Sequence, residues 1–277
     1  MSDIADRPSR NLRLPSPGLA ISVLIVGFWI VCAIFGSRIT PYDPLAVSVI
    51  ERLKPPSPEH WFGTDRLGRD VLSRVMAGSR SVVQIALSAT AIAITIGTFF
   101  GLLTGYFRGF VSDLIMRIFE AILAVPVVLL AMIAIVAVGP SSVTVLLVIG
   151  LVFVPVVART VRAAVLSERN CYYIHAALMR AENTPYILFR EILPNILGTI
   201  VVEATVRLGY AIFVAATLSF LGMGVQPPTP DWGLSIYESY GLISAGFWWP
   251  VAFPALAIAS LVVSINIIAE KTLVNGR

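Results

Sequence analysis

The sequence predicts an all-α polytopic membrane protein, a bundle of six transmembrane helices. Hydrophobic residues make up 57% of the 277 residues, and the mean hydropathy is +0.86. Only 13% of the residues are charged, against roughly 25% in a soluble domain. The charges are scattered between long uncharged stretches, several of which exceed the roughly 20 residues that a helix needs to cross a bilayer. This pattern indicates a chain surrounded by membrane lipid and argues against a nucleic-acid partner.

The first helix is predicted over 18–38, because no charge occurs between Arg13 and Arg38. The second is predicted over 82–106, within the next uncharged stretch. The segment 39–81 between them carries charges of both signs and is too polar to cross the bilayer. It is predicted to be an extracytoplasmic loop.

The third and fourth helices share one uncharged stretch, 121–158, which is too long for a single crossing. Gly139-Pro140-Ser141-Ser142 divides it, because glycine and proline interrupt helices. The prediction is therefore one helix over 113–138 and another over 143–166.

The fifth helix is predicted over 196–221 and contains two charges, Glu203 and Arg207. Their i,i+4 spacing places both side chains on one helix face, where they can pair. Either charge alone would cost about 2.5–3.5 kcal/mol at the bilayer centre. We therefore expect the pair to face the bundle, a partner subunit or a wet pathway. Two interpretations stay open: the pair lines a pathway, or it locks helix packing.

The sixth helix is predicted to begin at Trp248, within the uncharged stretch 239–269. The second to sixth helices then form a core over 82–270. Trp248 and Trp249, with Trp232 before them, are typical of an outer aromatic belt at the membrane surface. Isolated buried aromatic residues are the alternative interpretation.

The distribution of arginine and lysine predicts that both termini lie in the cytoplasm. In that orientation five arginines from Arg159 to Arg190 lie inside, while the loops after the third and fifth helices contain no arginine or lysine. The loop 39–81 holds six basic residues although it is placed outside, but long loops follow the rule weakly. The tails 1–17 and 271–277 are then cytoplasmic.

Residues 63–70, Gly-Thr-Asp-Arg-Leu-Gly-Arg-Asp, have the glycine spacing of a phosphate-binding loop. Arg69 and Asp70 stand where such a loop needs Lys and Ser/Thr, so nucleotide binding is not expected. Cys32 and Cys171 lie far apart and the chain has two histidines, so neither a metal site nor a catalytic constellation is expected. The sequence predicts no enzymatic activity and no cofactor, and any energy coupling would need a partner.

The segment 167–194 lies on the arginine-rich side and is too polar to cross the membrane. A short helix is predicted over 173–180, followed by a break at Asn183-Thr184-Pro185 and a second amphipathic stretch over 186–193. The apolar face of the short helix would comprise Ile174, Ala177 and Leu178. Periodicity alone fits two interpretations: a helix that docks into another protein, and a helix that lies on the membrane surface.

This segment resembles the EAA loop of ABC importer permeases, the cytoplasmic coupling helix that inserts into a groove of the ATPase. His175-Ala176-Ala177 stands at the Glu-Ala-Ala position, Ala181 at the usual glycine, and Ile192-Leu193-Pro194-Asn195 matches the apolar-Leu-Pro ending. His175 and Ala181 depart from the family pattern. The resemblance implies that the ATPase-coupling residues are Tyr173, Ile174, His175, Ala176, Ala177, Leu178, Ala181, Leu193 and Pro194.

Four further segments resemble the C-type permease subunit of dipeptide, oligopeptide, nickel and glutathione importers. They are Pro41–Pro44, His60–Arg80, Asp113–Pro126 and Leu218–Gly233. The similarity covers about residues 18–270 in the same order. It implies the type I ABC importer permease fold in the bacterial inner membrane. Its expected partners are a second, B-type permease subunit, two cytoplasmic ATP-binding subunits and an extracytoplasmic solute-binding protein.

The resemblance implies that the transported solute is a short peptide, with nickel, glutathione or another small solute as alternatives. An ion-coupled secondary transporter is a rival class. It would need an inverted repeat and an ion site of its own, and the sequence shows neither.

Overall fold

The computed structural model describes residues 17–275, so the predicted tail residues 1–16 and 276–277 lie outside the described part of the chain. No strand occurs within residues 17–275. The elements in chain order are α1 (Pro17–Ile39), α2 (Val71–Tyr106), α3 (Phe110–Leu123), α4 (Val127–Val138), α5 (Ser142–Glu168), α6 (Tyr172–Met179), α7 (Thr184–Tyr186), the π-helical segment η1 (Ile187–Ile192), α8 (Leu193–Phe220), α9 (Trp232–Ser239), the 3-10 segment η2 (Tyr240–Ala245) and α10 (Trp249–Asn275).

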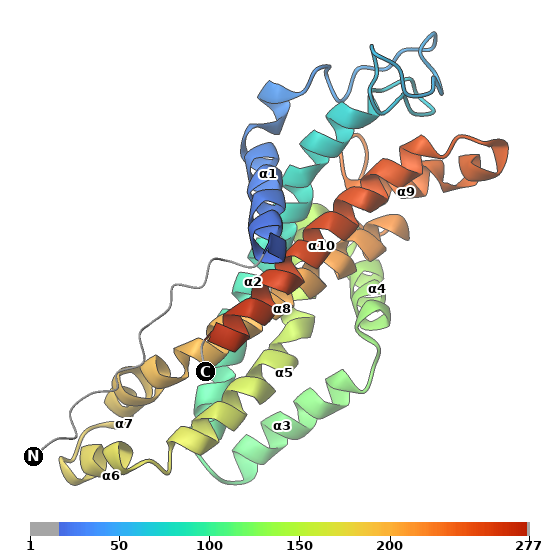
Figure 1. Cartoon of the computed structure of the whole chain (residues 1–277). Coiled ribbons are helices and arrows are strands. Elements are labelled where there is room, and N and C mark those ends of the chain that lie inside the picture. Colours follow the sequence, from blue (N-terminus) through green and yellow to red (C-terminus); the bar gives the residue numbers. More distant parts are fainter. Residues whose placement is uncertain (1–16, 276–277) are drawn as a thin grey trace, which may run out of the picture.

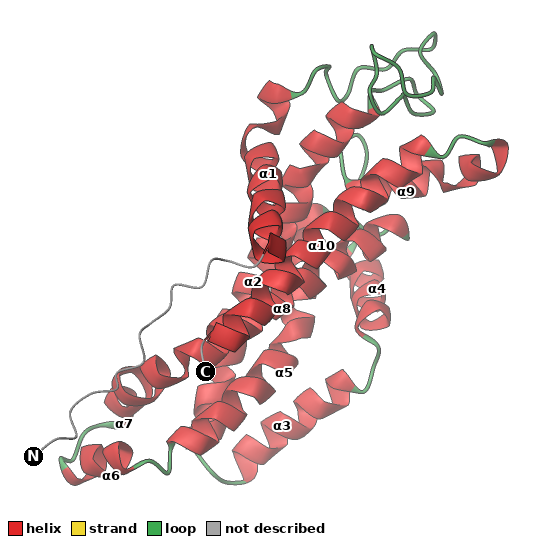
Figure 2. Cartoon of the chain, viewed as in Figure 1, coloured by secondary structure: helices red, strands yellow, loops and turns green. Residues whose placement is uncertain are grey.

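The helices form an elongated bundle with two distinct ends (Figure 1). Residues 40–70 and α9 lie at one end, which we call the loop end, and α6 and α7 lie at the opposite end, the α6 end. Figure 2 shows that the main loop region joins α1 to α2.

Within the described residues, five helices are long and apolar enough to cross a membrane: α1, α2, α5, the continuous helix Thr184–Phe220, and α10. α3 and α4 pass the same test only as a pair, and counting that pair as one span gives six. The prediction of an all-α membrane bundle is confirmed. α1, α5, α8 and α10 each begin within three residues of the predicted start.

The prediction of one continuous helix over 113–138 is wrong. The chain divides there into α3 and α4, which are bent by 93° relative to each other. Pro126 at the bend lacks a backbone N–H and disfavours a helical conformation at Val125, and its own ψ of 128° is extended. As a result α3 packs on α2 and α5, whereas α4 packs on α5 and α8.

The predicted boundary between the loop 39–81 and the helical core is also wrong, because α2 begins at Val71. Asp70 caps this helix by accepting a hydrogen bond from the Ser73 N–H at 2.8 Å. Hydropathy misses the first turns of α2 because they contain charged residues such as Arg74. The 36 residues of α2 span roughly 54 Å, well beyond a bilayer core of about 30 Å. The helix must therefore extend past the apolar layer.

Three glycines on α2 allow it to approach α5 closely. A Cβ added to Gly97, Gly101 or Gly105 would lie 2.6–2.7 Å from the Cβ of a valine on α5, closer than packed carbon atoms allow. The valines are Val157, Val161 and Val165. The G-x-x-x-G-x-x-x-G spacing is typical of membrane helices in close contact. This glycine spacing is the signal in the sequence that indicates the α2–α5 interface, and a hydropathy analysis does not detect it.

Replacing Gly101 with Val should destabilise the assembled protein, because the branched side chain would overlap Val161 of α5. Overpacking of this kind lowers the free energy of unfolding by about 1–3 kcal/mol. The measurement is the melting temperature of the detergent-purified protein, which should fall. Adding Val161→Ala should recover part of the loss. The matched control is Gly27→Val in α1, where an added Cβ meets nothing within 4 Å. Equal melting temperatures for Gly101→Val and this control would contradict the predicted overlap.

Candidate functional site

The α6 end of the bundle is built by a reversal of the chain after α5. Tyr173 in α6 donates a hydrogen bond from its hydroxyl to Glu168 Oε2 at 2.5 Å, tying α6 to the end of α5. Burial, followed by this contact with Glu168, raises the pKa of the Tyr173 phenol. Ala181 then adopts φ +56°, a left-handed conformation that favours glycine. Asn183 caps the next helix, accepting a hydrogen bond from the Tyr186 N–H at 2.9 Å.

The inner face of α6 packs on the chain itself. Ile174 and Ala177 are 1% and 0% exposed and belong to the same apolar cluster as Ile187, Leu188 and Ile192 of η1. The expectation that Ile174 and Ala177 present a surface for another protein is therefore wrong. The reversal near Ala181 folds η1 back onto α6, and η1 covers that face.

The outer face of α6 carries a different set of side chains. Tyr172 and Met179 are 94% and 89% exposed, and Leu178 is 50% exposed. His175 and Ala176 are exposed as well, and the spacing from Tyr172 through these two to Met179 follows one helix face. We call these five residues the outer α6 face. The periodicity assigned the apolar face to residues 174–178. It therefore missed Tyr172 and Met179, which lie just before and just after that segment.

The remaining predicted coupling residues surround α6 without joining its outer face. Tyr173 and Leu193 are half-buried, whereas Ala181 and Pro194 are exposed. An ion pair also links α6 to η1, since Arg180 Nη2, just after α6, lies 3.0 Å from Glu191 Oε1. The α6 end is therefore one packed unit of α6, the reversal and η1.

Glu203 and Arg207 lie on α8 and contact each other, with Nε of Arg207 2.8 Å from Oε1 of Glu203. Glu203 is 9% exposed. The Arg207 guanidinium lies 4.9 Å from the ring centre of Tyr210 and 5.8 Å from that of Phe153 on α5, distances typical of cation–π contacts. The pair therefore sits between α8 and α5, inside this chain.

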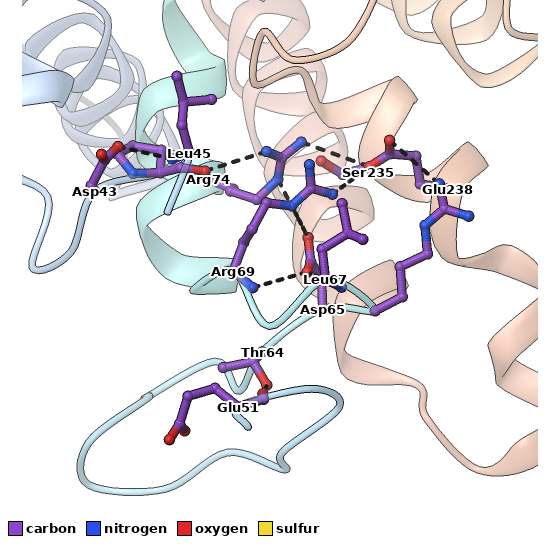
Figure 3. A network of polar contacts seen from close by, with 12 residues as sticks. Asp43, Leu45, Glu51, Thr64, Asp65, Leu67, Arg69, Arg74, Ser235 and Glu238 are labelled. Carbon is purple, nitrogen blue, oxygen red and sulfur yellow. Dashed lines mark hydrogen bonds and ion pairs between the residues drawn. The ribbon is translucent and has the colours of Figure 1, made fainter. Parts of the chain in front are cut away.

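The loop end contains a charged cluster that sequence reasoning missed. Arg69 Nη2 lies 2.6 Å from Glu238 Oε2 on α9, and Arg69 Nε lies 2.5 Å from Asp65 Oδ2 (Figure 3). Arg74 lies 3.8 Å from Asp65 and 3.9 Å from Glu238. These four side chains are at most 7% exposed, while Arg66, 3.7 Å from Glu238, is 49% exposed. We call the five residues the loop-end network.

The glycines of residues 63–70 serve the loop's own turns. Gly63 and Gly68 adopt φ +71° and +75°, which favours glycine. Between them Asp65 Oδ1 accepts hydrogen bonds from the N–H groups of Leu67 at 2.8 Å and Arg69 at 3.0 Å. The glycine spacing thus reflects a folded turn that orients Asp65 and Arg69 toward α9.

Two tryptophans are buried at the loop end, so the interpretation of an aromatic belt is wrong for both. Trp232 and Trp249 are 0% and 6% exposed. Trp232 Nε1 donates to the Val75 carbonyl at 2.7 Å, and Trp249 Nε1 donates to the Thr64 carbonyl at 3.0 Å. Of the three tryptophans assigned to the belt, Trp248, 53% exposed, is the one at a surface. The first contact joins the segments 60–80 and 218–233, which are far apart in sequence, and the second joins residues 60–80 to α10.

Comparison with known proteins finds similarity to membrane components of transport systems. Residues 97–271 match the family described as binding-protein-dependent transport system inner membrane component. The chain is 38% identical over 250 residues to the dipeptide transport system permease protein DppC of Alkalihalophilus pseudofirmus, covering 90% of this chain and 82% of that protein. It is 36% identical over 256 residues to the glutathione transport system permease protein GsiD of Pectobacterium atrosepticum, covering 91% and 82%.

The structure is also similar to an inward-facing conformation of the MetNI methionine ABC transporter. The alignment covers 72% of this chain and 94% of that chain, with a TM-score of 0.58 and 20% identity. At this identity the likeness shows a shared fold.

Proposed function

The chain belongs to the family of inner membrane components of binding-protein-dependent transport systems, and we propose that it is one of two permease subunits of an ATP-driven importer of short peptides. In this proposal it forms half of the translocation pathway. The observation that carries the substrate class is the 38% identity, over 90% of the chain, with a dipeptide permease. Import of glutathione is the second candidate, supported by the 36% identity with a glutathione permease.

In this proposal a second, B-type permease subunit completes the pathway, and two cytoplasmic ATP-binding subunits hydrolyse ATP. A solute-binding protein delivers the peptide from outside. We place both termini and the α6 end in the cytoplasm, supported by the arginines from Arg159 to Arg190. The loop end then faces the solute-binding protein.

We propose that the outer α6 face contacts an ATP-binding subunit. Its exposed apolar side chains, Tyr172, Leu178 and Met179, offer the kind of helix face that docks into a groove. The buried Ile174 and Ala177 fix α6 to η1, which continues directly into α8. A movement of the ATP-binding subunit would therefore be transmitted to α8 as a rigid displacement rather than lost in a flexible loop.

We propose that Glu203 and Arg207 lock the packing of α8 on α5, because both lie in the interior of this chain. Glu203→Gln or Arg207→Gln alone should lower the yield of assembled complex, since each leaves an unpaired buried charge. The double variant should recover part of that yield, with a coupling energy of about 0.5–3 kcal/mol in a double-mutant cycle. Additive losses would show that the two residues do not interact.

The double variant also distinguishes the two roles of the pair. If the pair is a packing lock, the recovered complex should transport peptide at a near-normal rate. A double variant that assembles fully yet transports poorly would contradict the lock and place the pair in the pathway.

The proposed function is tested with the complete transporter in proteoliposomes. Uptake of a labelled dipeptide should require both ATP and the solute-binding protein, and should exceed uptake of glutathione or Ni²⁺. Preferential glutathione uptake would select the second candidate. Uptake driven by a proton gradient without ATP would contradict the whole proposal.

A further inference from the structure

A cavity of about 530 Å³ opens between the ends of α1 and α2 at the loop end. Its volume lies within the roughly 300–1,000 Å³ that ligand sites occupy. One wall is apolar and belongs to the last turns of α1, while the other carries opposite charges. The apolar wall includes Cys32, Ala33 and Ile34, and the charged groups are Asp43 and Arg80.

The cavity lies where both helices leave the apolar layer. Arg80 immediately precedes the uncharged stretch of α2, which begins at Ser81, and the uncharged stretch of α1 ends just before Arg38. A ligand in the cavity can therefore touch water-facing charges and lipid-facing carbon atoms at once. Ile34, which lines the cavity, is 63% exposed, and Ile30 one turn away is 44% exposed. The apolar wall continues along the outside of α1.

The charged wall is open to a ligand. Arg80 is exposed, and within residues 17–275 no hydrogen bond or ion pair involves its guanidinium. Asp43 is exposed as well, and its Oδ1 accepts a hydrogen bond from the Leu45 N–H at 2.9 Å. The second carboxylate oxygen can accept further donors. One cavity thus offers a free cation and a carboxylate, separated widely enough that they do not pair with each other.

We propose that this cavity binds a phospholipid whose head group carries a primary ammonium. The phosphate would pair with Arg80, because guanidinium and phosphate form strong, often bidentate hydrogen bonds. The ammonium would donate to Asp43, and an acyl chain would lie along Ile34 and Ile30. A lipid is the ligand that uses all three features: cation, anion and the exposed apolar row on α1.

Native mass spectrometry of the assembled transporter, titrated with defined lipids, tests this site. Wild-type complex should retain phosphatidylethanolamine better than phosphatidylcholine, whose quaternary ammonium has no N–H to donate. Arg80→Gln should weaken retention of phosphatidylethanolamine roughly tenfold, the scale of one lost charge-assisted hydrogen bond. Asp43→Asn should reduce phosphatidylethanolamine to the level of phosphatidylcholine. Size-exclusion chromatography confirms that each variant assembles.

Arg38→Gln is the matched control, since Arg38 stands at the same end of α1 but does not line the cavity. It should leave lipid retention unchanged. The proposal is overturned if Arg80→Gln and Asp43→Asn retain phosphatidylethanolamine like wild type, or if Arg38→Gln loses as much. Displacement of the lipid by free dialanine, a water-soluble zwitterion, would overturn it as well, since the site would then serve a soluble ligand.

Discussion

Replacing Met179 with Asp should strongly reduce ATP-driven uptake while leaving the subunit folded in the membrane. Met179 is 89% exposed, so a charge there is harmless to the isolated chain. In the proposed contact the same charge would be buried without a partner, which is unfavourable. We expect uptake to fall roughly thirty- to hundredfold, the scale of a lost interface hot spot. The measurements are peptide uptake and ATP hydrolysis stimulated by the solute-binding protein.

Two variants serve as controls for Met179→Asp. His175→Glu puts a negative charge on the same outer face at the position where the EAA pattern has Glu, and should be tolerated. Ala177→Asp places a charge on the buried inner face and should instead reduce the yield of assembled complex. Normal uptake and normal stimulated hydrolysis in Met179→Asp would show that the outer α6 face is not the contact.

Replacing Glu238 with Gln should strongly destabilise the loop end. Glu238 and Asp65 are the carboxylates that face the buried guanidinium groups of Arg69 and Arg74 in the loop-end network. Removing one partner of a buried charge group costs about 3–5 kcal/mol. The expected result is a large fall in melting temperature and in the protection of residues 40–70 from proteolysis.

Arg66→Gln is the matched control for Glu238→Gln. Arg66 contacts the same carboxylate at 3.7 Å but is 49% exposed, and exposed ion pairs contribute about 0–1 kcal/mol. Equal stability losses in the two variants would contradict the view that burial gives the network its strength.

Hydropathy predicted α1 and α10 from uncharged stretches of membrane length. It predicted α5 and α8 as well, because each is mostly apolar although it contains charges, Glu203 and Arg207 in the case of α8. It could not place the start of α2, since Arg74 is charged and yet buried. The partner that permits this burial, Glu238, is distant in sequence. It also missed the bend at Pro126, because a proline inside an apolar stretch leaves the hydropathy unchanged.

The faces of α6 show a second limit of sequence reasoning. Periodicity identified Ile174 and Ala177 as an apolar pair but could not say what covers them. The answer depends on the reversal near Ala181 and on η1, whose π-helical geometry has no periodic signature. Trp232 and Trp249 pose the same problem, because a tryptophan at a membrane surface and one buried with its N–H bonded to a carbonyl look alike in a sequence.

Photo-crosslinking from α6 tests the proposed coupling contact most directly. A diazirine amino acid close in size to leucine is introduced at Met179 or at the buried Ile174 of the assembled transporter and activated by light. We expect the probe at Met179 to capture an ATP-binding subunit, and the probe at Ile174 to react within its own chain. Capture of an ATP-binding subunit from Ile174, or of lipid alone from Met179, would contradict the assignment of the outer α6 face.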